Sequence, residues 1–193
     1  MKAAYTLSEA ELLEGCRKGQ AQAQRMLYDR YSRIMFGVCL RYASSREDAQ
    51  DILQEGFIRV FKNLGTFRGE GSMEGWVRRI MIHTSIEHYR RRSKYFLVDV
   101  NEAQGLEVTP DAIGKLSRDE LLSLIQELPV GYRTIFNLYE VEGFSHQEIG
   151  AMMNVSVGTS KSQLSRAKSW LKERIEQLDK PFRAGPQAAA NAE

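Results

Sequence analysis

Aromatic and basic side chains are interleaved between residues 76 and 94, a mixture that suits contact with nucleic acid. Bases stack on aromatic rings while arginines follow the phosphates, so the pattern favours single-stranded or distorted DNA. The preceding segment, LGTFRGEGSM, is expected to form a loop whose backbone could approach an extruded base closely. The candidate contacts are Arg68, Trp76, Arg78, Arg79, His83, Arg90, Arg91 and Arg92.

These residues also have structural explanations, which the sequence leaves open. Trp76 and Ile80 could belong to a hydrophobic core, because tryptophan is on average a highly buried residue. The arginines at 90–92 could stabilise the end of their own helix, since cations near a helix C-terminus interact favourably with its dipole. Nucleic-acid binding by this segment is therefore a hypothesis.

A second candidate site lies at residues 144–174, which have the spacing of a helix-turn-helix. Ser145 and Glu148 form a capping-box pattern that opens a short helix. Asn154 can then make a tight turn, and Ser156 can cap a second helix. The second helix of such a motif enters the major groove of DNA, although a hairpin with a merely solvated charged face remains the alternative.

The second helix of this motif has two distinct faces. No acid interrupts residues 155–172, and lysine, arginine and serine can bind phosphates and base edges. The outward candidates are Lys161, Ser162, Ser165, Arg166 and Lys168. The expected buried stripe is Val157, Ser160, Leu164, Ala167 and Leu171, with small Gly150 and Ala151 where the two helices cross.

Acidic residues cluster on a third expected helix, at residues 46–64. Paired carboxylates could indicate catalysis or a metal, but no histidine or cysteine lies among them. We therefore interpret them as a stripe for docking onto a basic partner. Its members are Asp48, Asp51, Gln54 and Glu55.

The rest of the sequence argues against several functional classes. No phosphate-binding loop, nucleophile motif or metal-ligand spacing occurs, so we expect neither an enzyme nor a cofactor nor a small-molecule substrate. No apolar run approaches 18 residues, and the N-terminus is acidic where a signal peptide would be apolar. Two cysteines cannot build a disulfide framework. These features predict a cytoplasmic protein without direct membrane insertion.

Apolar residues recur at three- and four-residue spacings almost throughout, which predicts an all-α fold. Serines followed three residues later by glutamate mark helix starts at Ser8 and Ser117, and Ser72 is a plausible cap for a further helix. On the expected helix at residues 20–42, the buried face would contain Met26, Leu27, Tyr31, Ile34, Met35, Val38 and Cys39.

Charge is unevenly distributed along the 193 residues, although the net charge is only +2. Residues 1–94 carry a net charge of +6, residues 95–116 carry −3, and residues 117–180 carry −1. The middle segment has mixed periodicity and is longer than most connections inside a compact domain. We therefore expect two small helical domains, 1–94 and 117–180, joined by a flexible linker at 95–116 and followed by a disordered tail at 181–193.

Several motifs resemble those of the bacterial extracytoplasmic-function (ECF) sigma factors of RNA polymerase. DAQDILQEGF at 48–57, FRG at 67–69, WVRRI at 76–80 and RRR at 90–92 resemble sigma region 2. LPVGYR at 128–133, EGFSHQEI at 142–149 and VGTSKSQLSRA at 157–167 resemble region 4. The resemblance covers residues 8–178 in the expected order.

The resemblance implies a specific division of labour. Region 2 would bind the RNA polymerase core through the acidic stripe, and the −10 promoter element through the loop and basic helix. Region 4 would place Lys161, Ser162, Ser165 and Arg166 in the −35 major groove. An anti-sigma factor is a further implied partner, and nucleotidyl transfer would belong to the core.

Four positions depart from the commoner pattern of the resembled family: His83 replaces asparagine, Ser160 replaces valine, Gln163 replaces arginine, and Gly56 takes a place usually held by alanine or valine. These departures affect the promoter sequence that would be read. Two alternatives stay open: a sigma mimic that titrates an anti-sigma factor, and a stand-alone helix-turn-helix transcription regulator.

Overall fold

The computed structural model describes residues 7–93 and 118–183, with side chains placed from 7 to 91 and from 120 to 178. The chain divides into two compact units, Met1–Leu97 (unit 1) and Val98–Glu193 (unit 2). Helices make up nearly all of the described residues and no strand occurs among them, so the expected all-α fold is confirmed. The expected linker at 95–116 and the cap Ser117 lie outside the described residues.

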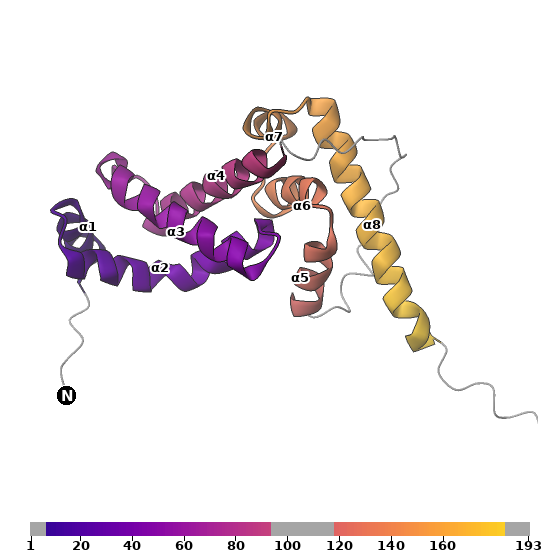
Figure 1. Ribbon diagram of the computed structural model, residues 1–193, viewed down its shortest axis with the longest axis horizontal. Coiled ribbons are helices and arrows are strands. Elements are labelled where there is room, and N and C mark those ends of the chain that lie inside the picture. The colour runs from indigo at the N-terminus through magenta and orange to yellow at the C-terminus, as the bar shows by residue number, and fades with distance from the viewer. Residues whose placement is uncertain (1–6, 94–117, 184–193) are drawn as a thin grey trace, which may run out of the picture. The chain divides into compact units, whose positions relative to one another are not determined.

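Unit 1 is built around three helices that pack against one another. The second, third and fourth helices contact each other in all three pairs, while the first packs on the second (Figure 1). Their bounds are α1 Glu9–Arg17, α2 Ala21–Tyr42, α3 Arg46–Asn63, the 3-10 turn η1 Leu64–Thr66, and α4 Met73–Ser93.

Serine side chains begin three of these helices, at Ser8 and Ser72 as the sequence predicts and also at Ser45. Ser8 and Glu11 complete a reciprocal capping box at α1, in which each satisfies a backbone N–H of the other. The Ser45 hydroxyl accepts a hydrogen bond from the Asp48 N–H at 3.1 Å. At α4, the Ser72 hydroxyl accepts from the Gly75 N–H at 3.0 Å. Such caps replace the partners that the first helical N–H groups lack.

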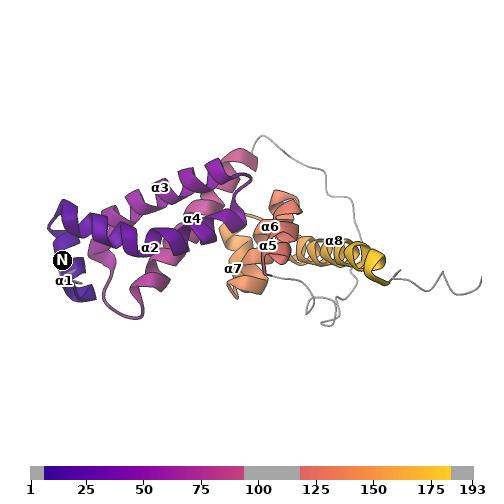
Figure 2. The same ribbon diagram turned by 90° about the horizontal axis from the view of Figure 1, so that it is seen from below.

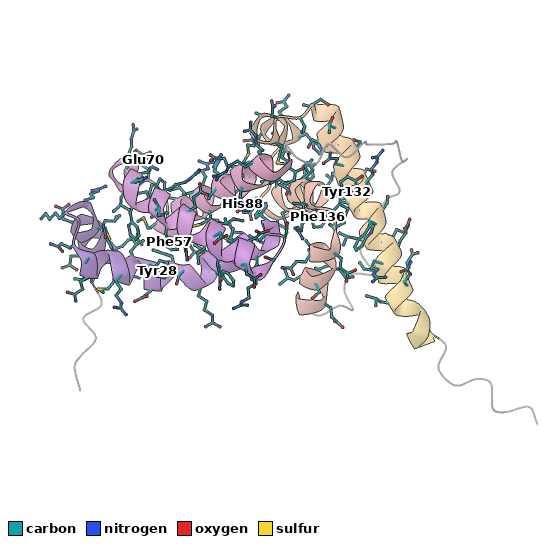
Figure 3. The ribbon with its side chains drawn as sticks, in the orientation of Figure 1. Tyr28, Phe57, Glu70, His88, Tyr132 and Phe136 are labelled. Atoms are coloured by element: carbon teal, nitrogen blue, oxygen red, sulfur yellow. The ribbon has the colours of Figure 1, made fainter. Side chains whose placement is uncertain are left out.

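The core of unit 1 lies between α2, α3 and α4. Leu27, Met35, Val60, Val77 and Met81 are fully enclosed there. Tyr28 also stacks at a tilt on Phe57, with ring centroids 4.6 Å apart (Figure 3). Of the expected buried face of α2, Leu27, Tyr31, Met35, Val38 and Cys39 are buried, whereas Met26 is half-buried and Ile34 is 48% exposed. The buried stripe of α2 is thus narrower than its run of apolar residues.

Unit 2 consists of shorter helices that pack along one long helix. Figures 1 and 2 show these helices beside the long one. Tyr132 and Phe136 of the second short helix pack against the apolar cluster to which the long helix contributes (Figure 3). The bounds are α5 Arg118–Glu127, α6 Val130–Phe136, the π-helical turn η3 Asn137–Val141, α7 His146–Met153 and α8 Val157–Arg183. Residues 181–183, which we assigned to the tail, are helical, and residues 184–193 lie outside the described range.

An apolar cluster joins α5 and α8 at the centre of unit 2. Trp170 and Leu121 lie partly buried at its edge. Its buried members are Leu124, Ile125, Leu128, Ala167, Leu171 and Ile175. Half of these come from the stripe of residues spaced three and four apart on α8, which is the arrangement expected for an amphipathic helix against a core.

Candidate nucleic-acid interfaces

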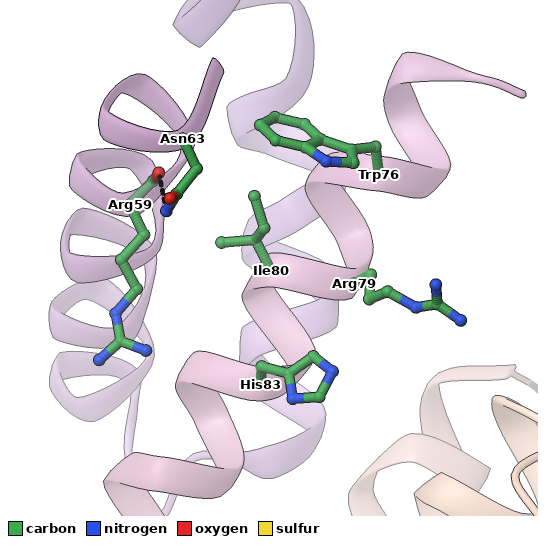
Figure 4. A pocket seen from close by; sticks show the side chains of 6 residues that line it. All are labelled: Arg59, Asn63, Trp76, Arg79, Ile80 and His83. Atoms are coloured by element: carbon green, nitrogen blue, oxygen red, sulfur yellow. Dashed lines mark hydrogen bonds between the residues drawn. The ribbon is translucent and has the colours of Figure 1, made fainter. Parts of the chain in front are cut away.

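A shallow, open pocket between α3 and α4 brings together three of the residues proposed for nucleic-acid contact (Figure 4). Trp76, Arg79 and His83 share one side of α4 because they are three and four residues apart. In Figure 4, Trp76 and Ile80 point toward α3, while the guanidinium of Arg79 extends away from it. The lining residues are Arg59, Asn63, Trp76, Arg79, Ile80 and His83.

Arg59 and Asn63 were missed by sequence reasoning. They lie one turn apart on α3, and the Asn63 amide donates a hydrogen bond to the Arg59 carbonyl oxygen at 2.9 Å (Figure 4). Nothing in the local sequence of α3 signals that its C-terminal half borders the aromatic-basic helix. Only the packing of α3 against α4 reveals it.

Trp76 has both a structural and a surface role. Its ring lies 5.5 Å from that of buried Phe67, at a tilt of 49°. It also remains partly exposed along the pocket. The two interpretations left open by the sequence are therefore compatible, because one part of the ring packs while another stays available for stacking.

The loop before α4 is shaped by two glycines. Gly69 and Gly71 have φ values of 79° and 86°, a left-handed conformation that disfavours residues with a Cβ. The loop is anchored at its base, where Arg17 of α1 donates to the Phe67 carbonyl oxygen at 2.7 Å. Arg68 is exposed beside this anchor, in the position expected of a loop contact.

The basic end of α4 is divided by its own helical geometry. Arg91 Nη2 donates to both carboxylate oxygens of Glu55 on α3, at 2.8 Å each. Arg90 is exposed, and Arg78 is half-buried. The side chain of Arg92 lies outside the described residues. The basic residues of this helix therefore do not form a single surface.

The pKa of His83 is lowered by partial burial in the pocket and by the positive charge of Arg79. The neutral imidazole is therefore favoured at neutral pH. A neutral ring can both donate and accept a hydrogen bond, whereas a cation can only donate. His83 is thus suited to contact a base edge or a sugar as well as a phosphate.

The four residues of the acidic stripe separate into two pairs. Asp48 lies 3.7 Å from His88 Nε2 of α4, and Glu55 is bound by Arg91. Asp51 and Gln54 are exposed, and Gln54 borders an open groove between α2 and α3. Asp48 and Glu55 are seven residues apart, two turns of the helix, and both reach side chains of α4.

The helix-turn-helix in unit 2 has the expected local geometry. Ser145 and Glu148 form a reciprocal capping box at α7, and Ser156 accepts from the Thr159 N–H at 2.9 Å to cap α8. Asn154 makes the turn with φ 58° and ψ 47°, the left-handed conformation that ends many helices. Gly150 lies at the crossing, where a Cβ would come within 2.9 Å of the Val155 carbonyl oxygen.

Two details of this motif differ from the sequence expectation. Val157 is 40% exposed rather than buried, because it is the first residue of α8 and precedes the crossing. Ala151 is also exposed, so Gly150 alone of the small pair lies at the contact. Ser160, Leu164, Ala167 and Leu171 are buried as expected.

A hydrogen bond fixes α8 against α7. Buried Ser160 lies with its hydroxyl 2.9 Å from His146 Nδ1, and the imidazole stacks on Tyr139 with centroids 4.4 Å apart. The pKa of His146 is lowered by burial and by the nearby charges of Lys161 and Lys168. Sequence reasoning did not single out His146, although its position one residue after a cap could have drawn attention.

The proposed recognition face of α8 is only partly exposed. Lys161 is exposed, while Ser162 and Ser165 are half-buried. Arg166 is also half-buried, and its Nη1 lies 3.4 Å from the Tyr132 hydroxyl. Lys168 is paired with Glu140 at 2.7 Å, so its charge is already matched within the unit.

Comparison with known proteins agrees with this arrangement. The Sigma-70 region 2 family matches residues 27–95, and the Sigma-70 region 4 family matches residues 118–171. The RNA polymerase sigma-H factor of Pseudomonas aeruginosa is 30% identical over 183 residues, covering 88% of this chain and 95% of that protein. The ECF RNA polymerase sigma-E factor of Escherichia coli K12 is 31% identical, covering 89% and 96%.

Two helical units with these two regions define a transcription initiation factor of the sigma-70 class. Within that class, the chain belongs to the ECF family of RNA polymerase sigma factors. The resemblance identified from the sequence motifs is confirmed. The protein accordingly binds RNA polymerase and promoter DNA and directs the initiation of transcription. In the two described ranges, no helix combines the length and apolar character needed to cross a bilayer.

Proposed function

We propose that the two units divide promoter recognition between them. Residues 1–94 bind the −10 element and residues 117–180 bind the −35 element, with 95–116 as the linker. The observation that carries this proposal is the pocket between α3 and α4, where Trp76, Arg79 and His83 lie side by side. An aromatic ring beside a cation and a polar ring can stack on an unpaired base while binding its phosphate.

In unit 1, the −10 contacts are made by the loop and by α4. Arg68 lies in the loop that captures an extruded base, and base extrusion costs a few kcal/mol that protein contacts must offset. Arg59 and Asn63 of α3 join this surface because they line the same pocket. The proposed contacts in α4 are Trp76, Arg78, Arg79, His83, Arg90, Arg91 and Arg92.

In unit 2, Lys161, Ser162, Ser165 and Arg166 contact the −35 element in the major groove. The capped start and the buried stripe of α8 hold the N-terminal part of this helix in a fixed position. In helix-turn-helix proteins, the residues that contact bases come from the N-terminal part of the second helix. The half-buried position of Arg166 restricts the directions in which its guanidinium can reach.

The core polymerase binds to the α3 stripe. Asp51 and Gln54 are the exposed members and supply the direct contacts. Asp48 and Glu55 support the stripe from its other side, where they contact His88 and Arg91 of α4. The protein itself catalyses no reaction and acts in the cytoplasm. An anti-sigma factor that covers its core-binding and DNA-binding surfaces holds it inactive.

Run-off transcription with bacterial core enzyme tests the proposal as a whole. Adding the full chain to core should produce initiation at discrete start sites on host promoters, and mapping those sites gives the promoter sequence. Capture of an anti-sigma factor without any protein-dependent initiation would instead indicate a sigma mimic. Tight binding of duplex DNA by the chain alone would indicate a stand-alone regulator.

A matched pair of substitutions tests the pocket. Arg79→Gln should weaken promoter binding by the holoenzyme for all sequences and reduce its salt dependence by about one phosphate contact. Arg25→Gln removes the same charge from an exposed ion pair with Asp29 on α2 and should have little effect. Equal behaviour of the two variants would remove Arg79 from the proposed interface.

A further inference from the structure

Glu87 interrupts the row of residues on α4 that we assign to nucleic-acid contact. It follows His83 by one turn and is the only acid between Gly75 and Ser93. A carboxylate beside a phosphate-binding surface repels the backbone that the surface must hold. Its presence there therefore needs a physical explanation.

Glu87 belongs to a network of two acids and two arginines between α3 and α4. Arg59 Nη2 donates to Glu87 Oε2 at 2.6 Å and to Glu55 Oε1 at 2.6 Å. Arg91 Nη2 also donates to Glu55, to both of its carboxylate oxygens. Two positive and two negative charges are thus joined into a neutral group, and its Arg59 borders the pocket of Trp76.

The network keeps its charges at physiological pH. The pKa of Glu87 is lowered by the hydrogen bond from Arg59. Burial raises the pKa of Glu55, but the hydrogen bonds from Arg91 and Arg59 more than offset this and the net shift is downward. The pKa of Arg59 is raised, mainly by its hydrogen bond to Glu87. Both acids therefore stay ionised and continue to occupy the arginines.

The consequence for a phosphate is direct. One nitrogen of Arg59 is shared between two carboxylates, so a phosphate can bind that nitrogen only by displacing at least one of them. Displacement is possible, because the Glu87 side chain is 49% exposed and can turn into solvent. A partly exposed ion pair is also weak enough to exchange.

We propose that Glu87 is an affinity-limiting residue, which occupies Arg59 and so reduces binding of arbitrary nucleic acid to this surface. The inference rests on the proposed −10 surface and adds a repulsive element to it. Specific recognition often uses repulsion as well as attraction, because repulsion penalises every partner that cannot supply compensating contacts. A fully contacted −10 strand supplies such contacts, whereas an arbitrary strand does not.

The alternative is that Glu87 merely ties α3 to α4, and glutamine distinguishes the two roles. Glu87→Gln removes the charge but keeps an oxygen that accepts the hydrogen bond from Arg59. Glu87→Ala removes both. A structural tie predicts unchanged binding for E87Q and weaker binding for E87A, whereas the proposed role predicts tighter binding for both variants.

The measurement is binding of the full chain to a labelled single-stranded thymidine oligonucleotide, by fluorescence anisotropy over a series of salt concentrations. E87Q should bind about two- to fivefold more tightly than the unchanged protein, the range expected from a partly exposed ion pair. The slope of log K against log salt should become more negative by about 0.7, because one more phosphate is neutralised on a single strand.

Asp29→Asn is the matched control, because it removes the same charge from an exposed ion pair on α2. If E87Q binds no more tightly than D29N, or more weakly than the unchanged protein, the proposal is overturned. Arg79→Gln separates this failure from that of the −10 surface itself. If R79Q loses binding while E87Q gains none, the role of Glu87 is rejected but the proposed −10 surface stands. If neither variant changes binding, both the role of Glu87 and the proposed −10 surface are rejected.

Discussion

Where α3 packs against α4, a glycine lies opposite a methionine. An ideal Cβ on Gly56 would lie closer to Met81 Sδ than van der Waals contact allows, and 3.0 Å from its terminal methyl carbon. Met81 is fully enclosed, so its thioether cannot move without displacing neighbours. We therefore predict that the effect of Gly56→Ala on stability changes sign with the size of residue 81.

The magnitude comes from two opposing contributions. Replacing glycine by alanine inside a helix stabilises it by about 1 kcal/mol, while overpacking a core costs about 1–3 kcal/mol. Gly56→Ala should thus lower the free energy of unfolding of unit 1 by up to about 2 kcal/mol. In a Met81→Ala background, which itself costs about 2–5 kcal/mol, the clash is absent and Gly56→Ala should stabilise by about 1 kcal/mol.

Urea denaturation of the four proteins of this double-mutant cycle measures the coupling. Trp170→Phe in all four leaves Trp76 as the only tryptophan, so fluorescence reports unit 1. Gly37→Ala on α2 is the control, since nothing lies within 4 Å of its Cβ position, and it should stabilise. Additive effects within about 0.5 kcal/mol, or stabilisation by Gly56→Ala beside Met81, would refute the reasoning.

Three further outcomes follow from the two units. Because the pKa of His146 is lowered in the folded state, the unfolded chain binds this proton more readily as pH falls. The melting temperature of unit 2 should therefore fall as pH drops below about 6.5, and thermal melts of His146→Phe should lack this decrease. Arg166→Ala should weaken holoenzyme binding to intact −35 sites by about 1–3 kcal/mol. An equal loss on a scrambled −35 site would show that Arg166 contacts a phosphate and not a base edge. Asp51→Asn should weaken binding to core polymerase, measured by competition with the unchanged protein, while Glu55→Gln should not. A larger loss for Glu55→Gln than for Asp51→Asn would exclude exposed Asp51 as the contact.

Features set by neighbouring residues in the chain could be predicted from the sequence. The capping boxes at Ser8 and Ser145 need only a serine and a glutamate three residues apart, and both form. Asn154 takes the left-handed turn because asparagine tolerates that conformation better than most residues. Hydrophobic spacing likewise located α2 and α3 to within a few residues.

Features set by tertiary packing could not be predicted in this way. Apolar spacing assigns a helix a buried face but not its width, and Ile34 lies beyond the edge that neighbouring helices cover. Arg59 reaches the proposed interface only because α3 packs on α4, a contact that no motif encodes. The bond between His146 and Ser160 likewise joins residues from two helices, 14 positions apart.

The three consecutive arginines at 90–92 show why charge must be counted in space rather than along the chain. Successive residues on a helix are rotated by about 100°, so neighbours in sequence cannot share a face. Arg91 accordingly points to Glu55 of α3, 36 residues away, while Arg90 is exposed. The effective charge of the proposed −10 surface is therefore smaller than its arginine count, and the salt dependence of binding should follow the smaller number. If every arginine of α4 were free to bind phosphate, the protein would bind DNA of any sequence tightly. Because some of these arginines are neutralised within the unit, the aromatic and polar contacts have a larger share in deciding which sequence is bound.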